Sequence, residues 1–120
     1  MGTELSPVHV VRRYLEDIYH RGNVELVREL CADPVTRHEP GATRTLTHQD
    51  QIERIIADLP QWQPHFTAEV LAGDGEFAVL VWTARGRTAD RTLSGIEVFQ
   101  VQDGRITDVW NTSYSTEPWG

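Results

Sequence analysis

Apolar residues recur at helical spacing near the start of the chain. Ser6 followed by Pro7 is a favourable helix start, because serine caps free backbone N–H groups and proline suits the first helical turn. The apolar stripe that follows comprises Val8, Val11, Leu15 and Ile18. Gly22 interrupts the pattern, so the spacing predicts a helix that ends at about His20–Arg21.

A second, shorter helical pattern begins directly after this glycine. Asn23 is a suitable cap for a helix from Val24 to about Cys31, which Asp33-Pro34 is expected to break. The residues Val35 to Glu39 predict a short extended piece, and Pro40-Gly41 ends it with a turn.

The third helical pattern starts at Thr47. Asp50, three residues later, makes an approximate capping box with this threonine. The apolar stripe of the helix is Ile52, Ile55, Ile56 and Leu59. Pro60 is expected to end it, because proline cannot donate the next backbone hydrogen bond.

From Phe66 onward the apolar period changes from helical spacing to two. Runs rich in β-branched and aromatic residues are separated by turn sequences such as Gly73-Asp74-Gly75 and Gln102-Asp103-Gly104. The predicted strands are Phe66–Leu71, Phe77–Arg85, Leu93–Val101 and Arg105–Tyr114. Helices followed by strands predict an α+β domain, with the helices on one face of an antiparallel sheet.

Two of these strands are apolar on both faces. Val79-Leu80-Val81-Trp82 is a continuous apolar run, and Leu93–Val101 has apolar residues at both odd and even positions. The helices can cover one face of the sheet, and no remaining segment is expected to cover the other. We therefore expect a homodimer that forms through the outer face of the sheet.

Composition narrows the possible classes of protein. The 120 residues fit a single domain spanning 1–120. Eighteen acidic residues and eleven basic residues, all of them arginine, give a formal net charge of −7, which argues against a nucleic-acid binder. Because the chain has no lysine, it can form neither a lysine Schiff base nor a P-loop.

Targeting and metal signals are also missing from the sequence. No apolar run approaches the ~20 residues of a membrane span, and residues 1–5 lack the pattern of a signal peptide. Cys31 is the single cysteine and has no disulfide partner within the chain, which favours a cytoplasmic protein. The five histidines show no close ligand spacing, so we expect no metal.

The order of elements and several short motifs resemble the nuclear transport factor 2-like fold. The motifs are Arg13-Tyr14-Leu15, Arg21-Gly22-Asn23, Cys31-Ala32-Asp33, His38-Glu39-Pro40-Gly41, and Gly95-Ile96-Glu97-Val98-Phe99 with Asp103-Gly104-Arg105-Ile106 and Trp110. The resemblance covers essentially the whole chain and implies a cone-shaped, curved antiparallel sheet packed on three N-terminal helices. It suggests ketosteroid isomerases and SnoaL-like polyketide cyclases as relatives.

This resemblance implies three catalytic positions. The isomerases have a carboxylate base before the Pro-Gly turn, here Glu39, a protonated acid on the penultimate strand, here Glu97, and a tyrosine on the first helix, here Tyr14. Compared with the isomerases, this sequence has one extra residue between Tyr14 and Gly22. One residue rotates a helix by about 100°, which changes the direction of Tyr14 relative to the helix end. Residues 111–114 carry no acid, unlike the corresponding stretch of many SnoaL-like cyclases.

Glu97 is a candidate on the residues alone. Its neighbours on the same strand face are Gly95 and Phe99, so a lone carboxyl there would lose water and favour its protonated form. A protonated carboxyl can donate a hydrogen bond to a substrate oxygen on which negative charge develops. The alternative is a Glu97 that pairs with an arginine or accepts a backbone hydrogen bond.

His38 and Glu39 are adjacent, so on an extended chain their side chains point to opposite sides. Glu39 matches the isomerase base, whereas His38 could act as a general base near neutral pH. The alternative is a turn in which neither is catalytic. Tyr14 is either an oxyanion donor or a core aromatic residue. The sequence leaves these choices open.

The remaining site candidates are mostly aromatic. The predicted substrate-binding residues are Trp62, Trp82, Phe99, Trp110 and Asn111. An aromatic-lined cavity suits a flat, apolar ligand, and packing in the core or an interface is the alternative. Asp108 lies on the opposite face of the last strand from Asn111 and is a weaker candidate.

Together these features predict cofactor-free acid–base chemistry on a small, apolar carbonyl compound, as an isomerisation, cyclisation or dehydration. One alternative is a non-catalytic ligand-binding or dimerisation module, because fold does not determine function. A second is epoxide-hydrolase-like addition of water, which in this fold resembles an Asp-Arg-Asp constellation. The sequence does not place this constellation, because the strand facing Glu97 offers Trp82 and Ala84 rather than an arginine.

Overall fold

A computed structural model describes residues 6–120 of the chain, and residues 1–5, where no signal peptide is predicted, lie outside the described part. The first helix begins as expected, with α1 at Pro7–Arg13 and the Ser6 side chain accepting a hydrogen bond from the backbone N–H of His9 (3.2 Å). It continues as a π-helix, η2, over Tyr14–His20. This wider turn, which the apolar stripe does not reveal, takes up one residue more than an α-helix of equal length.

The second helical segment begins at Val24 and ends at Leu30, within one residue of the predicted end. It consists of a 3₁₀ turn, η3, at Val24–Leu26 and one α-helical turn, α2, at Val27–Leu30. The helix therefore ends before Asp33-Pro34, but the extended piece starts earlier than the predicted Val35, because strand β1 begins at Cys31 and runs through this proline to Glu39. The ladder between β1 and strand β6 is irregular between Cys31 and Thr36, where a residue without a backbone N–H can be accommodated.

Helix α3 spans His48–Trp62 and has the predicted capping box between Thr47 and Asp50. Pro60 lies inside the helix and does not end it, contrary to the prediction. The helix can continue because later backbone groups still bond, with the N–H of Gln63 donating to the carbonyl of Leu59 (2.8 Å). Trp62 is 3% exposed, so its burial holds this last turn against the body of the protein.

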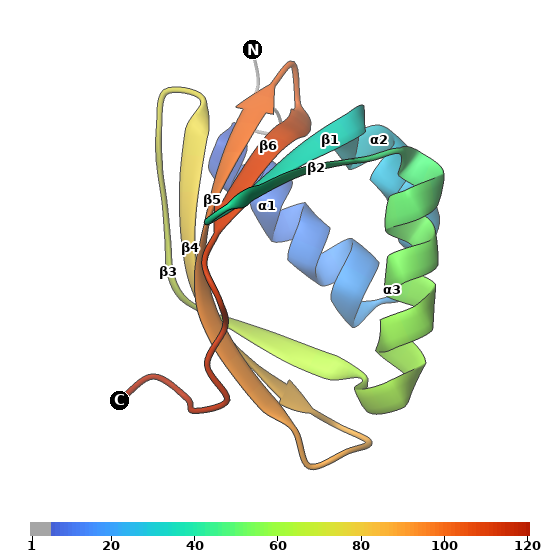
Figure 1. The fold of residues 1–120 in the computed structure, drawn as a ribbon, viewed down its shortest axis with the longest axis vertical. Helices are drawn as coiled ribbons and strands as arrows, with labels where there is room; N and C mark the ends of the chain where they lie inside the picture. Colours follow the sequence, from blue (N-terminus) through green and yellow to red (C-terminus); the bar gives the residue numbers. More distant parts are fainter. Residues whose placement is uncertain (1–5) are drawn as a thin grey trace.

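Six strands form one curved sheet in the order β2-β1-β6-β5-β4-β3 (Figure 1). Their bounds are Cys31–Glu39 for β1, Ala42–Leu46 for β2, Pro64–Asp74 for β3, Phe77–Gly86 for β4, Thr92–Gln102 for β5 and Arg105–Asn111 for β6. Strand β2 was not predicted, because its residues are mostly exposed and lack apolar alternation. The pair β1–β6 is parallel and the other pairs are antiparallel, so the sheet is mixed.

The helices cover the concave face of this sheet, as Figure 1 shows for α1 and α3. Residues on the inner face of β4 and β5 form the core together with the first helix. Among the most deeply buried are Val11, Ile18, Ala78, Leu80, Ala84 and Phe99. The α+β class and the arrangement of a curved sheet on N-terminal helices are therefore confirmed.

The outer face of the sheet carries exposed apolar side chains on four adjacent strands. We call Val70, Phe77, Val79, Ile96 and Trp110 the outer apolar face. The C-terminal segment runs beside β5, where Ser94 pairs with Ser115 and the indole N–H of Trp119 donates to the carbonyl of Trp82 (3.0 Å). Within residues 6–120, no helix is both long and apolar enough to cross a membrane.

Candidate functional site

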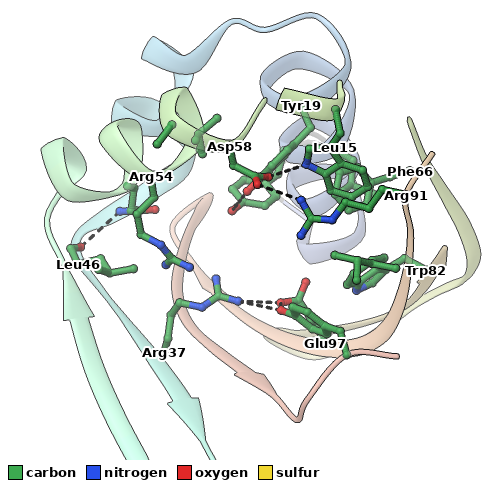
Figure 2. A pocket seen from close by; sticks show the side chains of 17 residues that line it. Leu15, Tyr19, Arg37, Leu46, Arg54, Asp58, Phe66, Trp82, Arg91 and Glu97 are labelled. Carbon is green, nitrogen blue, oxygen red and sulfur yellow. Dashed lines mark hydrogen bonds and ion pairs between the residues drawn. The ribbon is translucent and has the colours of Figure 1, made fainter. Parts of the chain in front are cut away.

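A cavity of about 490 Å³ lies between the helices and the inner face of the sheet. Helix α3 and the π-helix η2 form one side of it, and strands β1, β4 and β5 form the other (Figure 2). Its apolar wall includes the aromatic rings of Phe66 and Trp82, whose centroids are 5.3 Å apart. Polar groups gather at three places on this wall. One lies on strands β1 and β5, one lies on η2, and one lies where α3 meets the loop between β4 and β5, which we call the mouth of the cavity.

Glu97 and Arg37 form an ion pair on the sheet side of the cavity (Figure 2). The guanidinium Nη2 of Arg37 lies 2.7 Å from Oε2 of Glu97, and the side chains are only 14% and 12% exposed. The hydroxyl of Tyr114 donates to the same Oε2 (2.8 Å). Nη2 of Arg37 also donates to Oδ1 of Asn111 (3.3 Å). The alternative interpretation, in which Glu97 pairs with an arginine, is therefore confirmed.

This arrangement leaves the two carboxylate oxygens of Glu97 with different surroundings. Oε2 accepts both protein hydrogen bonds, whereas Oε1 accepts none from residues 6–120. Burial has the largest single effect on the pKa of Arg37 and lowers it, but Glu97 and three nearby tyrosines, Tyr14, Tyr19 and Tyr114, together outweigh burial and raise the pKa. Burial and the charge of Glu97 raise the pKa of Tyr114. Arg37 and Tyr114 thus keep their protons near neutral pH. Oε1 of Glu97 is not engaged by either donor and can accept a hydrogen bond or a proton from a bound molecule.

The sequence places these groups through a non-local arrangement of strands. Arg37 pairs in register with Val109 of β6, and Glu97 pairs with Asn111 of β6, so one strand separates the two. Neighbouring strands lie about 4.8 Å apart, and a long arginine side chain can span two such spacings, from β1 across β6 to β5. Strand β4 places no arginine opposite Glu97, as the sequence indicates, and the arginine comes instead from β1 on the β6 side.

Gly95 makes room for Tyr114. A Cβ atom at this glycine would lie 2.6 Å from Cδ1 of Tyr114 and 3.1 Å from Cζ2 of Trp82. The Tyr114 ring meets Trp82 edge-on, with centroids 5.0 Å apart. Tyr114 follows the end of β6, and the absent side chain at Gly95 lets its ring fold over the sheet toward Glu97.

Tyr14 and Tyr19 form a second polar group on the helix side of the cavity. Their hydroxyl oxygens are 3.4 Å apart. In an α-helix, residues five apart would point about 140° away from each other. The π-helical turn, whose hydrogen bonds join residues i and i+5, brings both rings to the cavity. Burial raises the pKa of each tyrosine, so both hydroxyls remain protonated.

The third polar group, at the mouth, joins helix α3 to the loop between β4 and β5. The backbone N–H of Arg87 donates to the carbonyl of Trp62 (2.9 Å), and the guanidinium of Arg91 lies 4.4 Å from the centre of the Trp62 ring. Asp58 accepts a hydrogen bond from the Trp62 indole (2.9 Å) and lies 3.6 Å from Arg91. The loop and helix thus hold each other in place at the mouth.

Most of the predicted site residues lie on or just behind the cavity wall. Glu97, Tyr14, Trp62 and Trp82 line it. Two others support lining residues without lining the cavity: Phe99, 1% exposed, packs edge-on against Tyr14 with centroids 6.0 Å apart, and Asn111 accepts from Arg37.

The other predicted residues lie away from the cavity. Glu39 is paired with Arg44 in the β1–β2 hairpin. On the outer face, His38 bonds to Asp108 (2.8 Å) and stacks on Trp110 with ring centroids 4.7 Å apart. Neither His38 nor Glu39 lines the cavity, and the catalytic role predicted for them stays a prediction.

Sequence reasoning missed several residues that line the cavity, namely Arg37, Arg54, Asp58, Arg91 and Tyr114. Arg37 had a detectable signal, because it alternates with Val35, a core residue of the same strand. Tyr114 lies beyond the last strand and has no periodic signal. Among residues 6–120, no group of three His, Cys, Asp or Glu side chains is placed to hold a metal ion.

The chain matches the model of the SnoaL-like domain family over residues 11–109. Similar solved structures include a proposed polyketide cyclase from Acidithiobacillus ferrooxidans, with 22% identity, a TM-score of 0.72, and 92% of this chain and 89% of that chain covered. A proposed ketosteroid isomerase from Kribbella flavida has 22% identity and a TM-score of 0.73, with 98% and 84% covered.

A third similar structure is an LEH-like epoxide hydrolase from M. tuberculosis. Its identity is 16% and its TM-score 0.74, with 94% of this chain and 84% of that chain covered. At these identities the likeness shows a shared fold. No relative of the chain is found among curated proteins.

Proposed function

This chain belongs to the SnoaL-like domain family, and on that premise we propose that it catalyses proton transfer on an apolar carbonyl compound bound in the cavity, without a cofactor. The single observation that carries the proposal is the carboxylate of Glu97. Arg37 and Tyr114 hold one of its oxygens, and the other accepts no hydrogen bond from residues 6–120.

Glu97 is the general base in this proposal. Its Oε1 takes a proton from the carbon next to the substrate carbonyl, and the C–H electron pair moves to the carbonyl oxygen to form an enolate. Returning the proton to a different carbon completes an isomerisation, and attack of the enolate on a second carbonyl closes a ring. The ion pair with Arg37 orients the carboxylate, since two donors fix Oε2.

Tyr14 and Tyr19 stabilise the enolate oxygen. Their two hydroxyls share one hydrogen bond, so one hydroxyl proton remains to donate to a substrate oxygen, whichever tyrosine is the donor in the pair. Burial keeps both phenols protonated, as their raised pKa values indicate. A donor that is fixed before the reaction stabilises developing negative charge without reorganising.

The proposal is tested by following hydrogen–deuterium exchange next to a ketone. Wild-type protein is incubated with 1-tetralone in D₂O, loss of the α-proton signal is followed by NMR, and a panel of β,γ-unsaturated ketones is assayed for isomerisation. Glu97→Gln should slow the catalysed exchange by roughly 10²–10⁴-fold, which is the usual contribution of a general base. Glu39→Gln tests the base that the resemblance implies.

Loss of exchange in Glu39→Gln with retention in Glu97→Gln would assign the base to Glu39 and refute the proposal. No turnover of any ketone by the wild type, with ketone binding retained, would favour the non-catalytic ligand-binding alternative.

One observation favours a second candidate, the addition of water to an epoxide. Arg37 bridges Glu97 and Asn111, an arrangement in which a carboxylate on a buried arginine could orient a water molecule. Asn111 cannot donate a proton as an acid, so a tyrosine would have to protonate the epoxide oxygen. Formation of diol from cyclohexene oxide, lost in Glu97→Gln, would support this candidate over ketone chemistry.

We further propose that the outer apolar face binds a second copy of the chain. The face comprises exposed apolar side chains from β3, β4, β5 and β6, with Phe77 and Trp110 rings 6.1 Å apart. A contiguous exposed apolar surface of this kind marks an interaction site. On these strands, the segment after β6 forms hydrogen bonds with Trp82, Ser94, Glu97 and Asn111, and none of these four residues belongs to the outer apolar face.

A further inference from the structure

Three arginines line the cavity, and one of them has no acidic partner. Arg37 pairs with Glu97 (2.7 Å), and Arg91 lies 3.6 Å from Asp58. Arg54, on helix α3, makes no ion pair with residues 6–120 and yet lines the same cavity. The cavity therefore carries one uncompensated positive charge, in a protein whose formal net charge is −7.

The local sequence explains why Arg54 has no partner. The helical neighbours four residues away on either side, Asp50 and Asp58, are both acids that could pair with it. Asp50 instead caps the helix by accepting from the backbone N–H of Thr47 (3.1 Å). Asp58 accepts from Trp62 (2.9 Å) and faces Arg91. Both acids are thus engaged elsewhere.

Figure 2 shows the guanidinium of Arg54 pointing from α3 into the cavity, toward the guanidinium of Arg37 on β1. The hydrogen bonds of Arg37 to residues 6–120 all use Nη2, so its Nε and Nη1 donate to none of these residues. Two like charges that face each other repel, and an anion placed between them relieves this repulsion. The free N–H groups of both arginines would be the donors to such an anion.

We infer that the substrate of this cavity carries a carboxylate, which Arg54 binds while the apolar part of the molecule lies against Phe66 and Trp82. The inference rests on the proposed function for the place of the reaction and adds the chemical class of the substrate. One uncompensated charge matches a monoanion. A phosphate dianion would bring a second negative charge close to Glu97 and Asp58, with no further cation to balance it.

The position of Arg54 also suggests how the substrate is oriented. Arg54 lies on α3, on the side of the cavity opposite the strand that carries Glu97 (Figure 2). A carboxylate held there leaves the ring system of the substrate to extend toward the aromatic wall. The surplus of positive charge also attracts anions into the cavity from solution, against the net negative charge of the whole chain.

The test uses two ligands of equal shape and different charge, 2-naphthoate and its neutral amide, 2-naphthamide, with affinities measured by isothermal titration calorimetry. Wild type should bind the acid about tenfold more tightly than the amide, because one partly exposed charged hydrogen bond contributes roughly this much to affinity. Arg54→Gln should remove this preference and leave amide binding unchanged. Arg28→Gln, which removes an exposed arginine outside the cavity, is the matched control and should behave as wild type.

Equal affinity of wild type for acid and amide, a loss of both affinities in Arg54→Gln, or no binding of either ligand would overturn the inference. Tighter binding of 2-naphthyl phosphate than of 2-naphthoate would assign the charge to a dianion instead. Exchange of the neutral ketone 1-tetralone depends on Glu97 and not on Arg54. Failure of that exchange with the acid preference intact would thus contradict the proposed function alone.

Discussion

Removal of the Arg37 guanidinium tests how strongly the fold depends on the pair that orients Glu97. In Arg37→Met the carboxylate of Glu97 stays in the cavity without its cation, since both side chains are less than 15% exposed. At a charge separation of about 4 Å and an effective dielectric constant near 20, the lost attraction is about 4 kcal/mol. Measured removals of one partner from a buried pair cost about 3–5 kcal/mol.

Because Oε1 of Glu97 faces the cavity, water can reach it, so we expect the lower end of this range, a loss of about 3 kcal/mol in the free energy of unfolding. For a chain of this length that lowers the melting temperature by roughly 12 °C. The assay is urea unfolding followed by circular dichroism, for Arg37→Met, Glu97→Met and the double variant. The double variant should recover most of the loss, because no unpaired charge remains.

The ion pair between Glu39 and Arg44 is the matched control. It joins the same residue types across the β1–β2 hairpin, but the side chains of Glu39 and Arg44 are 32% and 52% exposed. Solvent screens such a pair, so its double-mutant cycle should give an interaction energy below about 1 kcal/mol. An interaction energy below about 0.5 kcal/mol for Arg37 and Glu97 as well would refute the idea that Arg37 holds the carboxylate in place.

Three further predictions concern Gly95, His20 and the outer apolar face. Gly95→Ala should lower the free energy of unfolding by about 1–3 kcal/mol, because its Cβ would collide with Tyr114, whereas Gly120→Ala, with open space around it, should not. Burial lowers the pKa of His20; His65 and Arg87 lower it further, and Glu16 raises it. The unfolded chain therefore binds the His20 proton more tightly than the folded chain does. The stability that His20 contributes is therefore complete above about pH 6.5 and falls as the pH drops through its folded-state pKa. In urea unfolding between pH 7.5 and 5, wild type should lose more stability than His20→Gln, in which the amide oxygen can still accept from Phe66; equal losses would contradict this. Ile96→Arg should convert a dimer to a monomer in size-exclusion chromatography with light scattering, while Ile56→Arg, on the exposed side of α3, should not; a monomeric wild type would overturn the dimer proposal.

Local signals in the sequence predicted the elements whose ends depend on nearby residues. The Ser6-Pro7 start and the Thr47–Asp50 capping box act within one helical turn, so the sequence alone predicted both. Pro60 does not end α3, contrary to the sequence prediction, because burial of Trp62 and a later hydrogen bond outweigh the local preference of proline. Strand β2 has almost no apolar pattern and exists through its pairing with β1.

The candidate site was predicted where it follows strand alternation and missed where it depends on contacts across the sheet. Glu97 and Trp82 face inward by the period of two, and the sequence revealed this. Arg37 reaches Glu97 only because β1 pairs in parallel with β6, a topology that apolar patterning does not encode. Tyr19 joins Tyr14 only through a π-helical turn.

A crystal structure of the protein with bound 1-tetralone tests the central claim most directly, since the claim concerns one oxygen atom. The account predicts the ketone between Phe66 and Trp82, with its α-carbon about 3–3.5 Å from Oε1 of Glu97 and its carbonyl oxygen at a hydroxyl of Tyr14 or Tyr19. A ketone bound beside Glu39 or His38, or one in the cavity with its α-carbon turned away from Glu97, would contradict it.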